Sequence, residues 1–229
     1  MKKRKVGKLY IIATPIGNLK DITLRALDKL KKVDLILCED TRVASKLLNY
    51  YNIKKPLLSY HHHSKKKRRE EIIQKIYAGS SVALITDAGT PGLADPGNKL
   101  VDKIYQEKIK IEPLPGSSAL TTIISVAGIN LQQFVFLGFI PHKKGREKLF
   151  LEILEMVKKR PVIFYESRYR LLKTLERLQK EKINIIIGKE LTKMYEEIKR
   201  GTSQEIYNYY QNHSEKIKGE FTLIVYKSE

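Results

Sequence analysis

Four short apolar segments recur in the first half of the chain, and each runs directly into small, polar or turn-forming residues. These segments are Lys8–Ala13, Val33–Cys38, Val82–Ile85 and Lys110–Leu114. A helical pattern follows each of them. Alternating strands and helices predict an α/β fold with a mostly parallel sheet. Because ligands bind outside the carboxyl ends of the strands in such sheets, the repeated layout predicts one functional edge.

The segment Val82–Gly97, which reads VALITDAGTPGLADPG, shows this layout most clearly. Its continuous apolar start is typical of a strand buried on both faces. Residues Asp87–Pro91 then bend the backbone with no bulky side chain in the way. An ordinary loop between a strand and a helix would look the same if it stood alone. The three companion segments therefore favour the interpretation as a small-molecule site.

The second half of the chain has a different sequence pattern, in which the expected strands and helices are joined by only a few short links. We expect a mixed sheet with helices there, an N-terminal α/β domain over residues 1–117 and a C-terminal α/β domain over residues 118–229. Three residues are placed to cap helices: Asp21 before Ile22–Leu30, Thr41 before Arg42–Tyr51 and Ser167 before Tyr169–Glu181.

Composition excludes several classes of protein. The single cysteine, Cys38, rules out an intrachain disulfide and a multi-cysteine zinc site. No apolar run approaches the ~18 residues that cross a bilayer, so we expect a cytoplasmic protein without membrane contact. Neither G-x-x-x-x-G-K-[ST] nor G-x-G-x-x-G occurs, which argues against P-loop and dinucleotide-binding folds.

The charge balance is strongly basic, with 44 Lys and Arg against 25 Asp and Glu, a formal net charge of +19. Such an excess favours polyanionic partners such as nucleic acid, because each neutralised phosphate releases a counterion. A lysine-rich proteome would give the same excess, so charge alone leaves both explanations open. Residues 61–69 (HHHSKKKRR) fit a cationic surface segment or phosphate contact better than a metal site, because adjacent histidines cannot all face one ion.

Asp40 and Arg42 directly follow a predicted strand end, where side chains can reach the functional edge. A carboxylate there can bind a hydroxyl group or accept its proton, and a guanidinium can hold a phosphate through two hydrogen bonds. An acidic residue at the start of a helix also interacts favourably with the helix dipole. Both interpretations of Asp40 remain open from the sequence.

Together, these segments resemble the tetrapyrrole (corrin/porphyrin) methylase superfamily, and within it the small-subunit ribosomal RNA 2′-O-ribose cytidine methyltransferases. The matching stretches occur in order across almost the whole chain. They are TPIGNLKDITLRAL (Thr14–Leu27), CEDTR (Cys38–Arg42), DAGTPGLADPG (Asp87–Gly97), LPGSSA (Leu114–Ala119), FLGFIP (Phe136–Pro141), YES (Tyr165–Ser167), KELTK (Lys189–Lys193) and KGEFT (Lys218–Thr222).

The resemblance implies a homodimer of two-domain chains that binds S-adenosylmethionine in an interdomain cleft, without a metal. It implies cofactor contacts from Pro15, Ala88, Gly89, Thr90, Leu93, Ala94, Ser118, Ala119, Tyr165 and Leu191. It implies a small-subunit (16S) ribosomal RNA substrate, naked or assembled. For catalysis we expect Asp40 and Asp95 to engage the ribose hydroxyl, and Arg42 and Lys193 to hold or neutralise phosphate. A porphyrinoid C-methyltransferase and a non-catalytic ribosome-associated RNA-binding protein are the alternatives.

Overall fold

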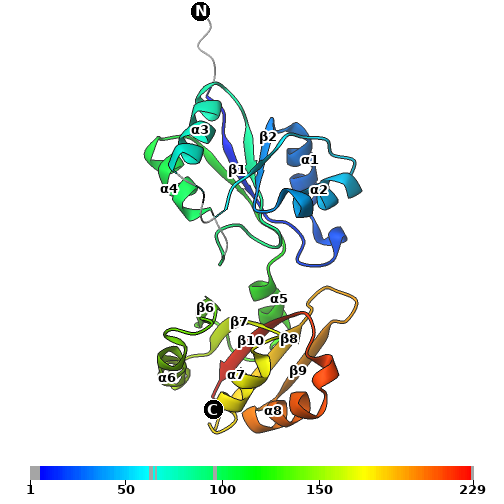
Figure 1. Ribbon diagram of the computed structural model, residues 1–229, viewed down its shortest axis with the longest axis vertical. Coiled ribbons are helices and arrows are strands. Elements are labelled where there is room, and N and C mark those ends of the chain that lie inside the picture. The colour runs from blue at the N-terminus through cyan, green and yellow to red at the C-terminus, as the bar shows by residue number, and fades with distance from the viewer. Residues whose placement is uncertain (1–5, 62–63, 65, 95–96, 228–229) are drawn as a thin grey trace, which may run out of the picture. The chain divides into compact units, whose positions relative to one another are not determined.

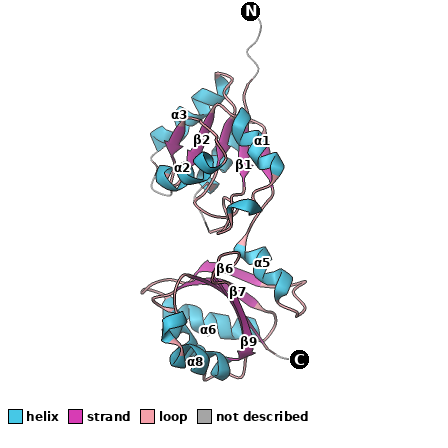
Figure 2. Cartoon of the chain, turned by 90° about the vertical axis from the view of Figure 1, so that its right-hand side faces the viewer, coloured by secondary structure: helices cyan, strands magenta, loops and turns pink. Residues whose placement is uncertain are grey.

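The computed structural model describes residues 6–61, 64, 66–94 and 97–227. The chain divides into two compact units, Met1–Ser118 and Ala119–Glu229, each built from strands and helices (Figures 1 and 2). The predicted α/β class is therefore confirmed for both parts of the chain. No helix among the described residues is both long enough and apolar enough to span a membrane.

The first unit is a parallel sheet with alternating helices. Its elements in order are β1 (Leu9–Ile12), η1 (Leu19–Asp21), α1 (Leu24–Lys32), β2 (Leu35–Cys38), α2 (Thr41–Tyr50), β3 (Leu57–Ser59), α3 (Lys66–Tyr77), β4 (Val82–Leu84), α4 (Asn98–Gln106) and β5 (Ile111–Leu114). The strand order is β3-β2-β4-β1-β5, and all neighbours run parallel. The predicted parallel sheet is confirmed, and its carboxyl ends share one edge.

Both faces of this sheet are covered, which explains the continuous apolar character of its strands. On β1, Tyr10 and Ile12 face the core under α1 and α2. Leu9 belongs to the opposite face of the sheet, where it packs with Leu84 in the core under α3 and α4. Figure 1 shows these two helix pairs on opposite sides of the strands.

The second unit contains a mixed sheet, as predicted. Its elements are α5 (Ala119–Val126), β6 (Val135–Phe139), α6 (Arg146–Val157), β7 (Val162–Ser167), α7 (Leu171–Leu178), β8 (Asn184–Lys189), β9 (Glu197–Thr202), α8 (Ser203–Asn212), η2 (Ser214–Lys216) and β10 (Glu220–Tyr226). The strand order is β6-β7-β10-β8-β9. Among the described strands of this sheet only the β6–β7 pair is parallel, and β10 runs antiparallel between β7 and β8.

The main core of this unit lies between one face of the sheet and the helices α6, α7 and α8. On the other face, Gly188 of β8 leaves room for apolar side chains. A Cβ atom at Gly188 would lie 2.6 Å from Cδ1 of Ile123 in α5 and 2.8 Å from Cδ2 of Leu191. The glycine therefore allows α5 and the segment after β8 to pack against the sheet.

All three predicted helix caps are wrong by one or a few residues, and the cap of α2 is described with the functional site below. Asp21 ends the short helix η1, and Thr23 caps α1 by accepting a hydrogen bond from the Ala26 amide at 3.1 Å. Ser167 belongs to β7, where it pairs with Glu220 of β10. Pairing in the sheet holds Ser167 in extended conformation, so α7 begins only at Leu171 and has no side-chain cap.

Candidate functional site

The loops after β1 and β4 are joined at the carboxyl edge of the first sheet. The Thr14 amide donates to the Gly89 carbonyl at 2.9 Å, and the Gly89 amide donates to the Thr14 carbonyl at 3.0 Å. The Thr14 hydroxyl donates to the Thr86 carbonyl at 3.1 Å, and its side chain is almost completely buried. These bonds fix two segments that are 75 residues apart in the sequence.

The loop after β5 joins the same structure. The Thr90 hydroxyl donates to the Ser117 carbonyl at 3.2 Å. A Cβ atom at Gly116 would lie 3.0 Å from Cβ of Ala13, so the loops after β5 and β1 approach closely. We call the three loops together the crest: residues 13–18, 86–94 and 115–118. The crest lies at the carboxyl edge of the sheet, which is where the repeated sequence layout predicts a functional edge.

The backbone of the crest takes conformations that few residues adopt. Gly89 has φ of +81° and Gly92 has φ of +87°, and Ala94 has φ of +65° although it is not glycine. Backbone strain in a non-glycine residue is concentrated at functional sites in proteins. Eight of the predicted cofactor residues lie on or next to the crest: Pro15, Ala88, Gly89, Thr90, Leu93, Ala94, Ser118 and Ala119. Asp95, a predicted catalytic residue, lies outside the described residues.

The loop after β2 contacts the crest through Asp40. The Asp40 amide donates to Oδ1 of Asp87 at 3.1 Å. The Asp40 carboxylate accepts from the Arg42 amide at 2.8 Å and therefore caps α2, where the sequence predicts Thr41 as the cap. It also accepts from Nε of Arg42 at 3.0 Å and from Nη2 at 2.5 Å.

The electrostatics of Asp40 follow from this pairing. The hydrogen bonds from Arg42 lower the pKa of the Asp40 carboxyl to about 2. The carboxylate is therefore fully ionised at neutral pH and is a weak proton acceptor while Arg42 holds it. The Arg42 side chain is 87% exposed. Asp40 thus caps α2. The same loop places the Asp40 carboxylate and the exposed Arg42 guanidinium beside the crest, where a substrate can reach Arg42.

Cys38 ends β2 below this loop and is fully buried. Burial, with smaller contributions from the charges of Asp87 and Asp40, raises the pKa of its thiol to about 11. A neutral buried thiol is unreactive, so Cys38 acts as a small apolar side chain in the core.

In the second unit, the pairing of β8 with β10 brings the KELTK and KGEFT stretches together. Nζ of Lys193 contacts Oε1 of Glu190 at 2.8 Å and Oε2 of Glu220 at 2.9 Å. Burial alone would lower the pKa of Lys193, but the hydrogen bonds to these two carboxylates raise it. A Cβ atom at Gly219 would lie only 2.2 Å from Cδ of Glu190, so this close approach requires glycine.

The pairing changes what Lys193 can do. Its ammonium group is already compensated by two carboxylates, so the predicted contact with a substrate phosphate would have to displace at least one of them. Besides Ala119, two predicted cofactor residues of this unit provide apolar surface. Leu191 is buried, and the half-buried ring of Tyr165 lies with its centroid 5.1 Å from that of Phe136 and 5.2 Å from that of Phe139.

Glu166 is the central residue of the YES stretch, and the sequence pattern indicates no role for it. Its side chain is completely buried and accepts hydrogen bonds from Arg146 at 2.9 Å, Arg170 at 2.8 Å and Thr174 at 2.7 Å. The network joins β7 to α6 and α7. The two arginines lie 20 residues before and 4 residues after the glutamate, a spacing with no common period, so only the fold reveals their convergence.

Within the described part of the chain, no group of three His, Cys, Asp or Glu side chains could hold a metal ion. Of the three adjacent histidines, only His61 is described, and Lys65 is also outside the described residues. In the cationic segment that follows, Lys66 lies 3.8 Å from Glu70 and Arg68 lies 2.8 Å from Glu71. Part of the positive charge at the start of α3 is therefore neutralised by the same helix.

A model of the tetrapyrrole (corrin/porphyrin) methylases matches residues 8–207. The chain belongs to this family. A relative from Borrelia garinii subsp. bavariensis is 43% identical over 96% of this chain and 99% of its own length, and is named ribosomal RNA small subunit methyltransferase I. A Thermotoga maritima protein with the same name is 42% identical over 96% of this chain and 98% of its own length.

Solved structures agree with the family's fold at much lower sequence identity. A diphthine synthase superposes with a TM-score of 0.74 at 11% identity, covering 97% of this chain and 91% of that one. A cobalt-precorrin-4 methyltransferase of cobalamin biosynthesis gives a TM-score of 0.67 at 18% identity, covering 95% and 94% of the two chains. At this identity the likeness concerns the methylase fold alone.

The donor set of the crest suits a nucleoside-containing ligand of this methylase family. Small residues and left-handed turns expose backbone amides and carbonyls, which can pair with the polar atoms of an adenosine or an amino acid. Two amides of this loop are already used within the protein, since the Gly89 amide donates to the Thr14 carbonyl at 3.0 Å and the Leu93 amide to the Thr90 carbonyl at 3.2 Å. Ala88, Gly92 and Ala94 are exposed and small, so the residues present at these positions fit S-adenosylmethionine at this edge.

Proposed function

We propose that this chain is an S-adenosylmethionine-dependent methyltransferase that 2′-O-methylates the ribose of a cytidine in small-subunit (16S) ribosomal RNA. One observation carries the proposal. Relatives that share 42–43% of their residues over 96% of the chain are named ribosomal RNA small subunit methyltransferase I. The net charge of +19 agrees with an RNA substrate, because a polyanion requires cationic contacts.

S-adenosylmethionine is the proposed methyl donor, and its sulfonium supplies an electrophilic methyl group without a metal. We propose that the crest and the adjacent Ala119 bind it, with contacts at Pro15, at residues 88–90, at Leu93 and Ala94, and at Ser118 and Ala119. Tyr165 and Leu191 supply apolar surface for the same ligand. The left-handed turns of the crest, including the strained φ of +65° at Ala94, support this assignment.

The chain's own residues must align the ribose hydroxyl with the methyl carbon and take its proton. We propose Arg42 as the phosphate contact, because its guanidinium is exposed beside the crest. Asp40 orients Arg42 through two-point hydrogen bonding, and it engages the hydroxyl only after releasing that guanidinium. Asp95 remains the second proposed partner of the hydroxyl, and Lys193 the second proposed phosphate group.

The decisive experiment is transfer of a labelled methyl group to purified small ribosomal subunits, followed by mapping of the modified ribose. The proposal expects one cytidine 2′-O-methyl group. Naked small-subunit RNA offered in parallel shows whether the assembled subunit is required. Labelled methyl on a base, or on a ribosomal protein, would contradict the proposal.

Two alternatives are tested by the same preparation. A porphyrinoid C-methyltransferase would label a porphyrinoid acceptor and leave RNA unlabelled. A non-catalytic RNA-binding protein would bind RNA without binding labelled S-adenosylmethionine. The sequence similarity favours neither alternative, since the relatives named above, at 42–43% identity, carry the name of a ribosomal RNA methyltransferase.

Three further properties accompany the proposed function. We propose a cytoplasmic location, because ribosomal subunits are the substrate. We propose a homodimer, which light scattering on the purified chain can measure. We also propose that the boundary between the N-terminal and C-terminal α/β domains lies near residues 117–118, where the sequence pattern of strands, helices and links changes.

A further inference from the structure

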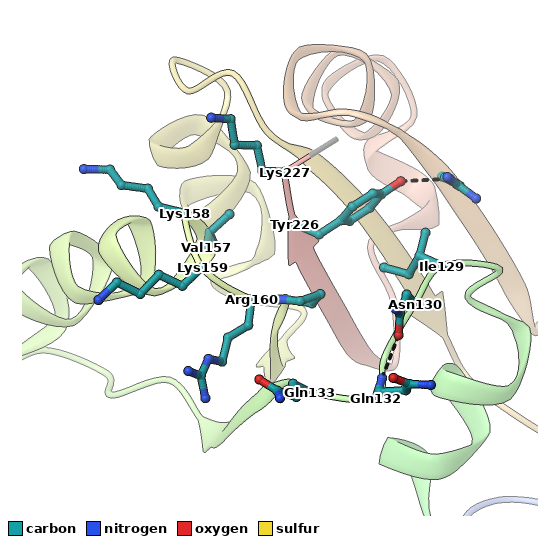
Figure 3. A pocket seen from close by; sticks show the side chains of 12 residues that line it. Ile129, Asn130, Gln132, Gln133, Val157, Lys158, Lys159, Arg160, Tyr226 and Lys227 are labelled. Carbon is teal, nitrogen blue, oxygen red and sulfur yellow. Dashed lines mark hydrogen bonds between the residues drawn. The ribbon is translucent and has the colours of Figure 1, made fainter. Parts of the chain in front are cut away.

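A groove of about 980 Å³ lies in the second unit (Figure 3). Its walls come from the loop between α5 and β6, the turn between α6 and β7, Arg200 of β9, and Tyr226 and Lys227 at the end of β10. All of these segments belong to the Ala119–Glu229 unit. The groove is therefore formed by one compact part of the chain.

The groove lies at the opposite end of the second sheet from Lys193 and Glu220. β10 starts at Glu220, which pairs with Ser167 at the end of β7, and it runs to the groove at Tyr226. At the other end of β7, Pro161 lines the groove. A strand of six residues spans about 17–20 Å, so the groove and the KELTK and KGEFT stretches are separated by that length.

The charged side chains that line the groove are all cationic. Among its lining residues are Lys158, Lys159, Arg160, Arg200 and Lys227, and none of the lining residues that the structure describes is Asp or Glu. Figure 3 shows the charged ends of Lys158, Lys159, Arg160 and Lys227 projecting to the same side of Tyr226. Lys158 also pairs at 2.5 Å with Glu155, which is exposed, and such surface pairs are easily displaced.

Arg200 is fixed at the inner wall. Its Nε donates to the Tyr226 hydroxyl at 2.8 Å, and its Nη1 donates to the Ala127 carbonyl at 3.5 Å. These bonds orient the guanidinium and leave it further N–H donors, since an arginine has five. The amide side chains of Asn130, Gln132 and Gln133 add neutral donors and acceptors on the wall below Tyr226 (Figure 3).

We propose that this cationic groove is an accessory site for the sugar–phosphate backbone of single-stranded RNA, which holds RNA outside the nucleotide to be methylated. The identity of the ligand as RNA rests on the proposed function. Exposed cations on long side chains around a wide groove suit a chain of phosphates better than one small anion, which needs buried donors. Tyr226 is 7% exposed, so bases cannot stack on it, and the phosphate contacts that remain carry no sequence information.

The test compares two variants that lose the same charge. The groove variant carries Lys158→Gln, Lys159→Gln and Arg160→Gln. The control carries Lys32→Gln, Lys54→Gln and Lys110→Gln, which are exposed at the amino ends of strands in the first unit. Fluorescence anisotropy measures the affinity of each full-length protein for a labelled single-stranded fragment of small-subunit RNA, and for a random sequence of the same length, over a range of salt concentrations.

The groove variant is expected to bind both RNAs about tenfold more weakly near 0.1 M salt and to flatten the log–log salt slope by about 2, since each lost contact removes about 0.7. The control is expected to keep the wild-type slope. Equal losses in both variants, or no loss in the groove variant, would overturn the proposal. Loss of binding to assembled subunits without loss of RNA affinity would also overturn it, because a ribosomal protein would then occupy the groove.

Folding and function are monitored separately. A thermal melt checks each variant, and the double variant Lys159→Gln/Lys227→Gln repeats the test with residues from two different elements. Methyl transfer at saturating RNA should persist in the groove variant. If the wild-type protein binds RNA through the groove but transfers no methyl group to it, the proposed function fails and the groove stands. If the groove variant keeps both methyl transfer and RNA affinity, the groove proposal fails and the proposed function stands.

Discussion

Gly89 and Gly145 share a backbone conformation but differ in their surroundings. Their φ angles are +81° and +82°, where side chains are disfavoured. A Cβ atom at Gly89 would lie 3.4 Å from Cγ2 of Ile16 and 3.7 Å from the Ser117 carbonyl oxygen, whereas a Cβ atom at Gly145 would meet nothing within 4 Å. The two glycines therefore separate the effect of backbone strain from the effect of displacing the crest.

We expect Gly89→Val and Gly145→Val each to destabilise the fold by about 1–2 kcal/mol, because both place a side chain on left-handed backbone. Only Gly89→Val should abolish the rise in melting temperature that S-adenosylmethionine produces, since stabilisation disappears when binding does. Thermal melts with and without the cofactor measure both effects. Full cofactor stabilisation of Gly89→Val would remove the crest from the binding site.

A second prediction for a single residue concerns Asp40 and the pH dependence of stability. Its carboxyl has a pKa of about 2 in the fold against 3.8 as the unperturbed value. A carboxyl with a depressed pKa stabilises the fold above its unfolded pKa and loses this contribution as pH falls through the folded pKa. The melting temperature of Asp40→Asn should therefore lie below the wild-type value near pH 6, and this gap should shrink between about pH 4 and pH 2.

The same variant tests catalysis. Asparagine is as good a helix cap as aspartate, so α2 should persist. If Asp40 takes the ribose proton, single-turnover methyl transfer should fall strongly while RNA affinity is kept. If Asp40 only orients Arg42, Asp40→Asn should mainly weaken RNA binding, and Arg42→Lys should do the same because it replaces a two-point contact by a point charge.

At the scale of elements, Glu166 joins β7 to α6 and α7. We expect Glu166→Gln to destabilise the second unit by about 3 kcal/mol, because it leaves the largely buried guanidinium groups of Arg146 and Arg170 without a countercharge. Chemical denaturation measures the loss. Glu155→Gln is the matched control, because its pair with Lys158 is on the surface and contributes about 0–1 kcal/mol. Equal effects of the two changes would contradict a structural role for the buried network.

Elements are predictable from the sequence where a local pattern decides them. The apolar run that contains β4 and the turn residues after it indicate both the strand and the edge of the first sheet. The start of α7 is not predictable in this way, because the pairing of Ser167 with Glu220, far along the chain, keeps Ser167 extended. For the same reason no local pattern shows the contact of Lys193 with Glu220, or the compensation of the Lys193 charge that follows from it.

At the scale of the whole molecule, the sequence states the net charge of +19 but not its distribution. The groove in the second unit collects cations from the α6–β7 turn, β9 and the end of β10, which no single stretch of sequence displays. The lysine-rich start of α3 is visible as a stretch, yet Lys66 and Arg68 face Glu70 and Glu71 on the same helix. A run of cationic residues in the sequence and a concentration of uncompensated cations on the fold therefore do not coincide in this chain.

This difference leads to the last prediction. For the wild-type protein, RNA affinity should fall linearly on a log–log plot against salt, while the affinity for S-adenosylmethionine should barely change, because the cofactor displaces few counterions. The variant Lys66→Gln/Lys67→Gln/Arg68→Gln should flatten the RNA slope by less than the groove variant does, although each removes three charges. Glu70 and Glu71 already neutralise part of the α3 segment, so an RNA phosphate there releases fewer counterions. A larger change of slope from the α3 variant would place the principal RNA contact on α3 instead of the groove.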